Sequence, residues 1–332
     1  MYDPSLCDNC GECLAKCHYL DFDEKSGGQA ILALYNGEDS PWIISCITCF
    51  GCNEYCTRAA MPFDLIVSRM EESGKYLDPA LVDMMHGHFS PKGDFAAPEV
   101  KGRAISLCTI YSVLPKDCFD GKLFDGLTPL KGRFFFCHIL YPHLGNMSLF
   151  EKEMPGVIER LAATGADEII FVHDDCFAMI QMAQNKGMEL PFKATHIIEY
   201  LLEYVNENAA DVKPLDMKIA YQRPCASRMS PEKEGALDKL FDKIGVTRVA
   251  RKFDREKALC CGENSGGAIP ARAGQEEFQD KNIQDAVDHN ASAMVFLCPM
   301  CMGALGKKAE EKGLKNIFIT DLVKMAVGEK DF

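Results

Sequence analysis

The chain has 332 residues, of which 47% are apolar and 26% charged, a composition typical of a soluble protein with two or three domains. Its formal net charge of −13 argues against nucleic-acid binding, because phosphate binding needs clustered Lys and Arg. No apolar run reaches the roughly 18 residues of a membrane helix, and the start MYDPSLCDNC lacks the features of a signal peptide. We therefore expect a cytoplasmic protein with no direct membrane span.

Cysteine is the residue type that stands out in this composition. The chain contains 17 cysteines, an odd number, and many of them are grouped at short spacings. In a long chain with no visible export signal, such groups indicate metal ligands rather than a disulfide framework. The spacings within these groups therefore indicate which cofactors they could hold.

Two CxxCxxCxxxC runs lie within the first 56 residues. The first run contains Cys7, Cys10, Cys13 and Cys17, and the second contains Cys46, Cys49, Cys52 and Cys56. Three thiolates within seven residues can surround one corner of a cubane cluster, and Gly11 and Gly51 ease the tight turn that this requires. The runs predict a mostly helical ferredoxin-type domain, residues 1–90, with two [4Fe-4S] clusters.

In the bacterial two-cluster arrangement, the fourth cysteine of each run binds the other cluster. We therefore assign Cys7, Cys10, Cys13 and Cys56 to one cluster, and Cys46, Cys49, Cys52 and Cys17 to the other. Zinc is the alternative, since paired cysteines suit tetrahedral sites, but a third cysteine two residues further on in both runs disfavours it. His18 and Thr57 stand where the bacterial run has proline.

A linker separates this segment from the rest of the chain. The pattern from Ser68 to Phe89 predicts a helix, and Pro91, Gly93 and Pro98 then interrupt any regular element. Beyond the linker a weak internal repeat predicts two copies of one unit, residues 101–210 and 217–330.

In each copy, apolar strands that end at a cysteine are separated by amphipathic helices. Two such helices are expected over 151–164 and 271–290. Alternating strands and helices predict a parallel α/β sheet whose site lies beyond the carboxyl ends of the strands. The expected architecture is thus α+β followed by α/β: a ferredoxin-type domain and a pseudo-duplicated α/β domain.

The second copy contains a spaced set of five cysteines. They are Cys225, the vicinal pair Cys260 and Cys261 followed by glycine, and the pair Cys298 and Cys301. Five thiols exceed the four ligands of a structural zinc, so either one of them is idle or the cofactor is larger.

This spacing resembles the CCG domain of heterodisulfide reductase catalytic subunits. The order of a ferredoxin domain and two CCG copies is similar to subunits in which both are fused. The resemblance implies that these five cysteines hold a noncubane [4Fe-4S] cluster and form the catalytic site.

The first copy departs from the CCG pattern. Its matching residues are Cys108, Cys137 with His138, and His173 with Cys176. These residues leave three interpretations open: a Cys3His zinc site that uses one of the two histidines, an unusual cluster, or a relic packed in a core. Cys118 lies outside every match and is expected to be a free thiol.

The resemblance implies two roles. The first is a catalytic or electron-relay subunit of a heterodisulfide reductase-like complex, which receives electrons from a flavoprotein or other redox subunit and acts on a thiol/disulfide substrate. The second is a non-catalytic subunit that links a flavoprotein dehydrogenase to a quinone-linked or ferredoxin acceptor. Arg223 and Arg228, which flank Cys225, could bind an anionic substrate or pair with acidic residues.

Overall fold

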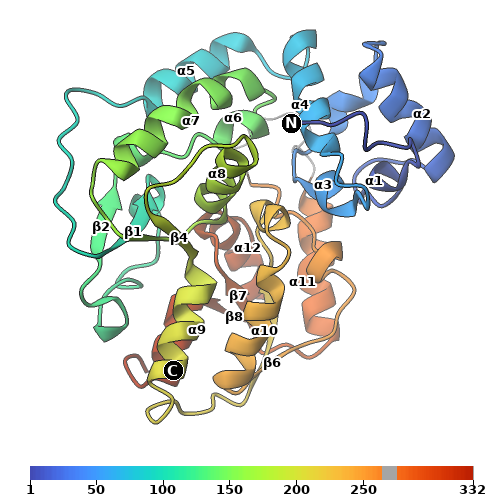
Figure 1. Ribbon diagram of the computed structural model, residues 1–332. Coiled ribbons are helices and arrows are strands. Elements are labelled where there is room, and N and C mark those ends of the chain that lie inside the picture. The colour runs from blue at the N-terminus through green and yellow to red at the C-terminus, as the bar shows by residue number, and fades with distance from the viewer. Residues whose placement is uncertain (264–274, 332) are drawn as a thin grey trace.

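The computed structural model describes residues 1–263 and 275–331, which form a helical N-terminal part and two sheet-containing halves (Figure 1). The helices of the N-terminal part are α1 Glu12–Ala15, α2 Glu24–Tyr35, α3 Gly51–Tyr55, α4 Pro62–Ser73 and α5 Pro79–Phe89. Asp23 caps α2 through a reciprocal pair of hydrogen bonds with Ser26, which satisfies N–H groups that the first turn leaves unpaired. The cysteine runs thus lie in loops and in the two short helices α1 and α3.

The single helix expected from Ser68 to Phe89 is wrong. Helix α4 already begins at Pro62 and ends at Gly74, whose left-handed φ of 60° stops the helix. Helix α5 then begins at Pro79, with the Asp78 side chain accepting a hydrogen bond from the Ala80 N–H. The sequence pattern ran through this break because both helices are amphipathic.

The first half contains a four-stranded parallel sheet. Its strands, in the spatial order β2-β1-β3-β4, are β1 Arg103–Cys108, β2 Thr128–Lys131, β3 Glu168–Phe171 and β4 Lys193–His196. Its helices are α6 Leu140–His143, α7 Met147–Ala162, α8 Asp174–Asn185 and α9 Ile197–Glu207. The helix expected over 151–164 is thus the larger part of α7.

The second half repeats this topology. Its parallel strands, in the order β6-β5-β7-β8, are β5 Met217–Gln222, β6 Val246–Arg248, β7 Ala293–Phe296 and β8 Lys315–Phe318. Its helices are α10 Lys233–Lys243, α11 Glu276–Asp288, α12 Pro299–Glu311 and α13 Ile319–Ala326. Residues 271–274 of the helix expected over 271–290 lie outside the described residues. The expectation of parallel α/β sheets is confirmed, whereas the ferredoxin type of the N-terminal part stays a prediction.

The two central strands of the first sheet, β1 and β3, are buried along most of their length because both faces of the sheet are covered. Ala104 and Phe171 point into a core shared with the N-terminal helices, whereas Ile105 and Ile170 point into a second core. That second core also contains Tyr221 and other residues of the second half. The two halves therefore pack against each other directly, and the carboxyl ends of their central strands come close together.

Candidate functional site

The two N-terminal cysteine runs share one backbone conformation. Asn9 and Gly11 of the first run have φ values of 57° and 79°, and Thr48 and Phe50 of the second have φ values of 53° and 62°. Alternation between right- and left-handed residues turns successive N–H groups to one side, which makes a concavity that suits anionic sulfur.

Phe50, rather than Gly51, is the left-handed residue of the second turn, at the position of Gly11 in the first turn. Its buried ring packs on Phe63, with ring centroids 4.1 Å apart, and on His143 at 5.1 Å. This packing holds a conformation that is strained for a bulky residue.

The two N-terminal cysteine runs lie close to each other. Burial, followed by the negative charges of Cys56, Cys10 and Cys7, raises the pKa of Cys13 to about 12. Burial, followed by the negative charge of Cys49, raises the pKa of Cys17 to about 11. Each fourth cysteine thus lies near the other run.

These groups suit a cationic metal core. Several thiolates repel one another in a buried place, so the charged forms are compatible only when a positive centre lies between them. Backbone N–H groups also reach sulfur: Thr48 donates to the Cys46 Sγ and Ala60 to the Cys56 Sγ, each at 3.4 Å. Such N–H···S contacts are a usual means of tuning iron–sulfur centres.

The five cysteines of the second half gather where the strands end. Cys225 opens the 3-10 turn after β5, Cys298 is the N-cap of α12, and Cys301 lies in the first turn of that helix. The Cys225 and Cys260 Sγ atoms are 3.0 Å apart, and Cys261 is hydrogen-bonded to Cys301. All five residues therefore converge on one buried place.

The charges at this place favour a thiolate at Cys298. A hydrogen bond from the Cys301 thiol lowers the pKa of Cys298 well below its usual value; burial opposes this effect and His173 adds to it. In contrast, the hydrogen bond to Cys260, followed by burial, raises the pKa of Cys225 well above its usual value.

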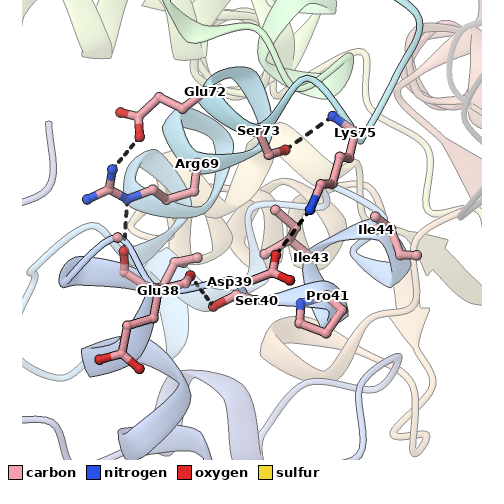
Figure 2. A pocket seen from close by; sticks show the side chains of 12 residues that line it. Glu38, Asp39, Ser40, Pro41, Ile43, Ile44, Arg69, Glu72, Ser73 and Lys75 are labelled. Atoms are coloured by element: carbon pink, nitrogen blue, oxygen red, sulfur yellow. Dashed lines mark hydrogen bonds and ion pairs between the residues drawn. The ribbon is translucent and has the colours of Figure 1, made fainter.

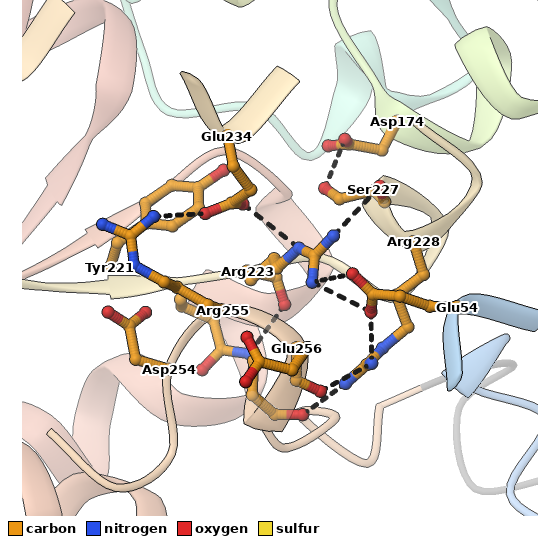
Figure 3. A network of polar contacts seen from close by, with 12 residues as sticks. Glu54, Asp174, Tyr221, Arg223, Ser227, Arg228, Glu234, Asp254, Arg255 and Glu256 are labelled. Carbon is orange, nitrogen blue, oxygen red and sulfur yellow. Dashed lines mark hydrogen bonds and ion pairs between the residues drawn. The ribbon is translucent and has the colours of Figure 1, made fainter. Parts of the chain in front are cut away.

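The second cysteine run lies directly against this site. The Glu54 carboxylate forms ion pairs with Arg223 and Arg228 (Figure 3). In each pair, a guanidinium nitrogen of the arginine lies 2.7 Å from a carboxylate oxygen of Glu54. The Arg228 guanidinium also lies over the Tyr55 ring, 5.4 Å from its centroid. Of the two roles expected for Arg223 and Arg228, the structure therefore shows pairing with an acidic residue, here one of the N-terminal part.

Tyr19 forms a second contact between the N-terminal cysteine runs and the five-cysteine site of the second half. Its hydroxyl accepts a hydrogen bond from the Cys260 N–H at 2.7 Å, and its ring packs on Phe278 of α11, with centroids 4.8 Å apart. Burial, then the charges of Cys260 and Cys49, raises the pKa of Tyr19 well above its usual value. The Tyr19 side chain therefore lies between a cysteine of the N-terminal runs and the vicinal pair.

In the first half, three of the matching residues form a compact group. The Sγ atoms of Cys108, Cys137 and Cys176 all lie within 4.8 Å of one another, and all three residues are buried. Burial opposes ionisation of Cys108, but hydrogen bonds from the other two thiols lower its pKa well below its usual value. Within residues 1–263 and 275–331, no other set of three or more Cys, His, Asp or Glu is as compact.

Neither histidine belongs to this three-cysteine group. The His173 Nε2 lies 3.3 Å from the Cys298 Sγ, in the other half. Burial disfavours the imidazolium, but the charges of Asp175 and Cys298 outweigh it and raise the pKa of His173 to about 10. His173 and Cys298 are the N-caps of α8 and α12, so equivalent positions of the two halves meet.

Cys118 is apart from these centres. It is buried in the core of the second half, and burial raises its pKa to about 12. Cys118 is a free cysteine, as expected, and its burial makes it an unreactive thiol.

Two hollows differ in their relation to these centres. One, of about 490 Å³, is walled by apolar side chains such as Phe89 and Leu140, and Cys108, Cys137 and His173 reach it. The other, of about 560 Å³, lies near α4, where Lys75 pairs with Asp39 at 3.3 Å and Arg69 pairs with Glu72 (Figure 2). Cysteine chemistry is therefore associated with the first hollow.

A family model described as the CCG cysteine-rich domain matches residues 219–306, which include all five cysteines of the second-half site. A dihydromethanophenazine:CoB–CoM heterodisulfide reductase subunit from Methanosarcina barkeri is 28% identical over 181 residues, 52% of this chain and 43% of that protein. The chain thus contains a CCG cysteine-rich domain and is heterodisulfide reductase-like in sequence. The same subunit from Methanosarcina acetivorans is 29% identical over 150 residues, 43% of this chain and 36% of that protein.

The resemblance expected from the cysteine spacing is thereby confirmed, although this heterodisulfide reductase-like chain spans less than half the length of these curated relatives. A solved structure of a hypothetical protein from Helicobacter pylori shares its fold, with a TM-score of 0.62 and 13% identity over 84% of this chain and 61% of that one. Across the described residues, no helix has the length and apolar character needed to cross a bilayer.

Sequence reasoning missed Glu54, Tyr19 and the contact between His173 and Cys298. Glu54 lies between two cysteines of a run, where any residue fits the spacing, and Tyr19 follows a run without belonging to it. Their importance comes from residues about 170 to 240 positions away in the chain. One signal was available: His173 stands at the repeat position of Cys298.

Proposed function

We propose that the chain is the subunit of a heterodisulfide reductase-like complex in which electrons pass from two N-terminal [4Fe-4S] clusters to a noncubane [4Fe-4S] cluster in the second half. Residues 1–90 would form the entry domain, and 101–210 and 217–330 the two CCG copies. The observation that carries this proposal is the direct contact of the second cysteine run with the Cys225 turn.

The ligands of the entry clusters would be the crossed sets, Cys7, Cys10, Cys13 and Cys56, and Cys46, Cys49, Cys52 and Cys17. The ligands of the third cluster would be Cys225, Cys260, Cys261, Cys298 and Cys301. When bound, such clusters store and transfer single electrons. A flavoprotein or another redox subunit would supply the electrons, because no dinucleotide fingerprint occurs in the sequence.

The chain's own residues support the transfer in two ways. Glu54 neutralises Arg223 and Arg228 at the contact between the N-terminal part and the second half, which keeps the two redox centres in fixed positions. The His173 Nε2 lies 3.3 Å from the Cys298 Sγ and can donate a hydrogen bond to it, which favours the more negative, reduced state of a centre bound there.

We further propose that the reaction is reduction of a disulfide. One S–S bond breaks, two electrons and two protons are taken up, and two thiols are formed. The open hollow beside His173 supports an enzyme over a pure electron relay, because a substrate needs a route to the site. The relay role remains the competing outcome of the experiment.

Anaerobic iron analysis with EPR tests the cluster assignment. Three four-iron clusters give about 12 iron atoms per chain, whereas about 8 would refute the third cluster. A Cys261→Ser variant should change the EPR signal of the third cluster and leave the N-terminal signals unchanged, and Cys118→Ser should match the wild type.

Mixing reduced protein with disulfides separates the enzyme from the relay. Loss of two electrons per disulfide, with thiol formation that Cys261→Ser abolishes, supports catalysis. Oxidation of the protein by a redox partner, with every disulfide tried left intact, would contradict catalysis.

A further inference from the structure

The apolar hollow of about 490 Å³ reaches residues of the five-cysteine site in the second half. His173 lines the hollow, and its Nε2 lies 3.3 Å from the Cys298 Sγ. Met300, which stands between Cys298 and Cys301 in α12, lines it as well. A molecule in this hollow therefore lies beside the place where the third cluster is proposed to bind.

The walls of this hollow are aromatic and adaptable. Phe89 and Phe136 both line it and stack on each other, with ring centroids 4.5 Å apart and an angle of 17° between the rings. Met84, Met85 and Met300 also line it, and methionine side chains adjust to ligands of different outline because they are unbranched and flexible. Such walls favour a ligand with an aromatic or aliphatic body.

The charges at the hollow disfavour an anionic ligand. Among the described residues that line it, none is Lys or Arg, and Asp175 contributes a carboxylate. Both ring nitrogens of His173 are already engaged, because Nδ1 lies 3.6 Å from the Asp175 Oδ2 and Nε2 faces the Cys298 Sγ. An anionic group would thus lose its hydration without gaining a cationic partner.

The hollow near α4 differs in charge. That hollow, of about 560 Å³, is lined by four charged residues that form ion pairs, Asp39 with Lys75 and Arg69 with Glu72. A charged ligand would find partners there, whereas the hollow beside the cysteines offers apolar contacts.

The size of the apolar hollow sets the size of the ligand. A dry protein cavity of about 150 Å³ accommodates benzene, so the hollow of about 490 Å³ has room for two such rings joined through sulfur, with small substituents. A disulfide with two apolar organic groups has this size and shape.

We propose that the substrate of this site is a neutral disulfide whose two organic groups are apolar, and that the hollow binds it before reduction. The inference rests on the redox function proposed above and adds the class of substrate to it. In the reaction one S–S bond breaks and two S–H bonds form, with two electrons that the clusters pass on from the redox subunit and two protons from water. The apolar walls act on binding.

Binding without turnover tests the class of ligand. The probes are two thioethers, which have no S–S bond to reduce: 4,4′-thiodibenzoate, an anion, and its neutral dimethyl ester. We expect calorimetric titration of the anaerobically purified full chain to give a dissociation constant at least about tenfold lower for the diester. Equal affinities, tighter binding of the dicarboxylate, or no binding of the diester would overturn the proposal.

Met84→Arg tests whether the ligand binds in this hollow. The Met84 side chain is 61% exposed, so arginine fits there without disturbing the core and adds a cation to the hollow. We expect dicarboxylate binding to strengthen by about fivefold, the effect of an exposed ion pair near the upper end of the usual range. Leu32→Arg, at a 43% exposed residue of α2 outside the hollow, adds the same charge and should leave both affinities unchanged. Equal effects of the two variants would refute binding in the hollow.

Oxidation of the clusters separates this inference from the redox function. The reduced protein, freed of excess reductant, is mixed with the two corresponding disulfides, 4,4′-dithiodibenzoate and its dimethyl ester. We expect the second-order rate of cluster oxidation to be at least about tenfold higher with the diester. Equal rates would overturn the class of substrate alone. Binding of the diester thioether without reduction of the diester disulfide would overturn the redox function, and the preference measured by binding would stand.

Discussion

Glu54→Gln is expected to weaken the contact between the N-terminal part and the second half. The Glu54 side chain is 10% exposed and pairs with Arg223 and Arg228, which are 1% and 4% exposed. After the change, Arg223 keeps its ion pair with Glu234 at 3.1 Å. Arg228 pairs with no other carboxylate among the described residues, and it retains the Tyr55 ring and the backbone carbonyls of Glu256 and Ala258.

The magnitude follows from these remaining partners. Removing one partner of a buried ion pair costs about 3 to 5 kcal/mol, and the glutamine amide oxygen still accepts one hydrogen bond, so we expect about 3 kcal/mol. For a chain of this length that loss lowers the Tm by about 5 °C. The matched control is Glu72→Gln, since the Glu72 side chain is 60% exposed and should contribute less than about 1 kcal/mol.

Anaerobic thermal unfolding measures the difference, and rapid mixing with a reductant measures how fast the second-half centre is reduced. We expect the lower Tm together with slower reduction of that centre in Glu54→Gln alone. A Tm for Glu54→Gln within about 1 °C of the control would refute the reasoning that this buried pair joins the two parts.

Two further predictions concern other parts of the chain. Gly28→Ala should destabilise the protein by about 2 kcal/mol and lower the iron content, because an added Cβ would lie 2.1 Å from the Asn9 carbonyl oxygen in the first cysteine run; Gly87→Ala, with nothing within 4 Å, is the control for both measurements. Equal iron content in the two variants would contradict this. Burial opposes ionisation of Glu168, but hydrogen bonds from Lys193 and Thr195 and the charge of Arg103 lower its pKa below 4.5, so the stability it contributes is present above pH 4.5 and is lost as the pH falls through the lower folded-state pKa. Acid titration of unfolding should therefore show a smaller loss of stability in Glu168→Gln than in the wild type, and parallel curves would refute the role of this carboxylate.

The sequence by itself predicted the ligand sets and the repeated unit. Cysteine spacing is a local property: a CxxCxxC run brings three thiols together whatever the rest of the chain does, and the five-cysteine pattern identified the CCG domain that residues 219–306 match. The alternation of apolar strands and amphipathic helices likewise predicted parallel sheets, because both periodicities are written in neighbouring residues.

Only the tertiary structure decided how these sets face one another. Phe50 adopts a left-handed conformation because a packing partner distant in sequence, His143, outweighs its local preference. The same holds for the contact of Glu54 with two arginines and of His173 with Cys298. Cys108, Cys137 and Cys176 form a compact group without the histidines beside them, since the fold directs His173 toward the other half. Which residues a side chain contacts depends on how the two sheets pack against each other. The spacing of residues along the chain does not determine that packing.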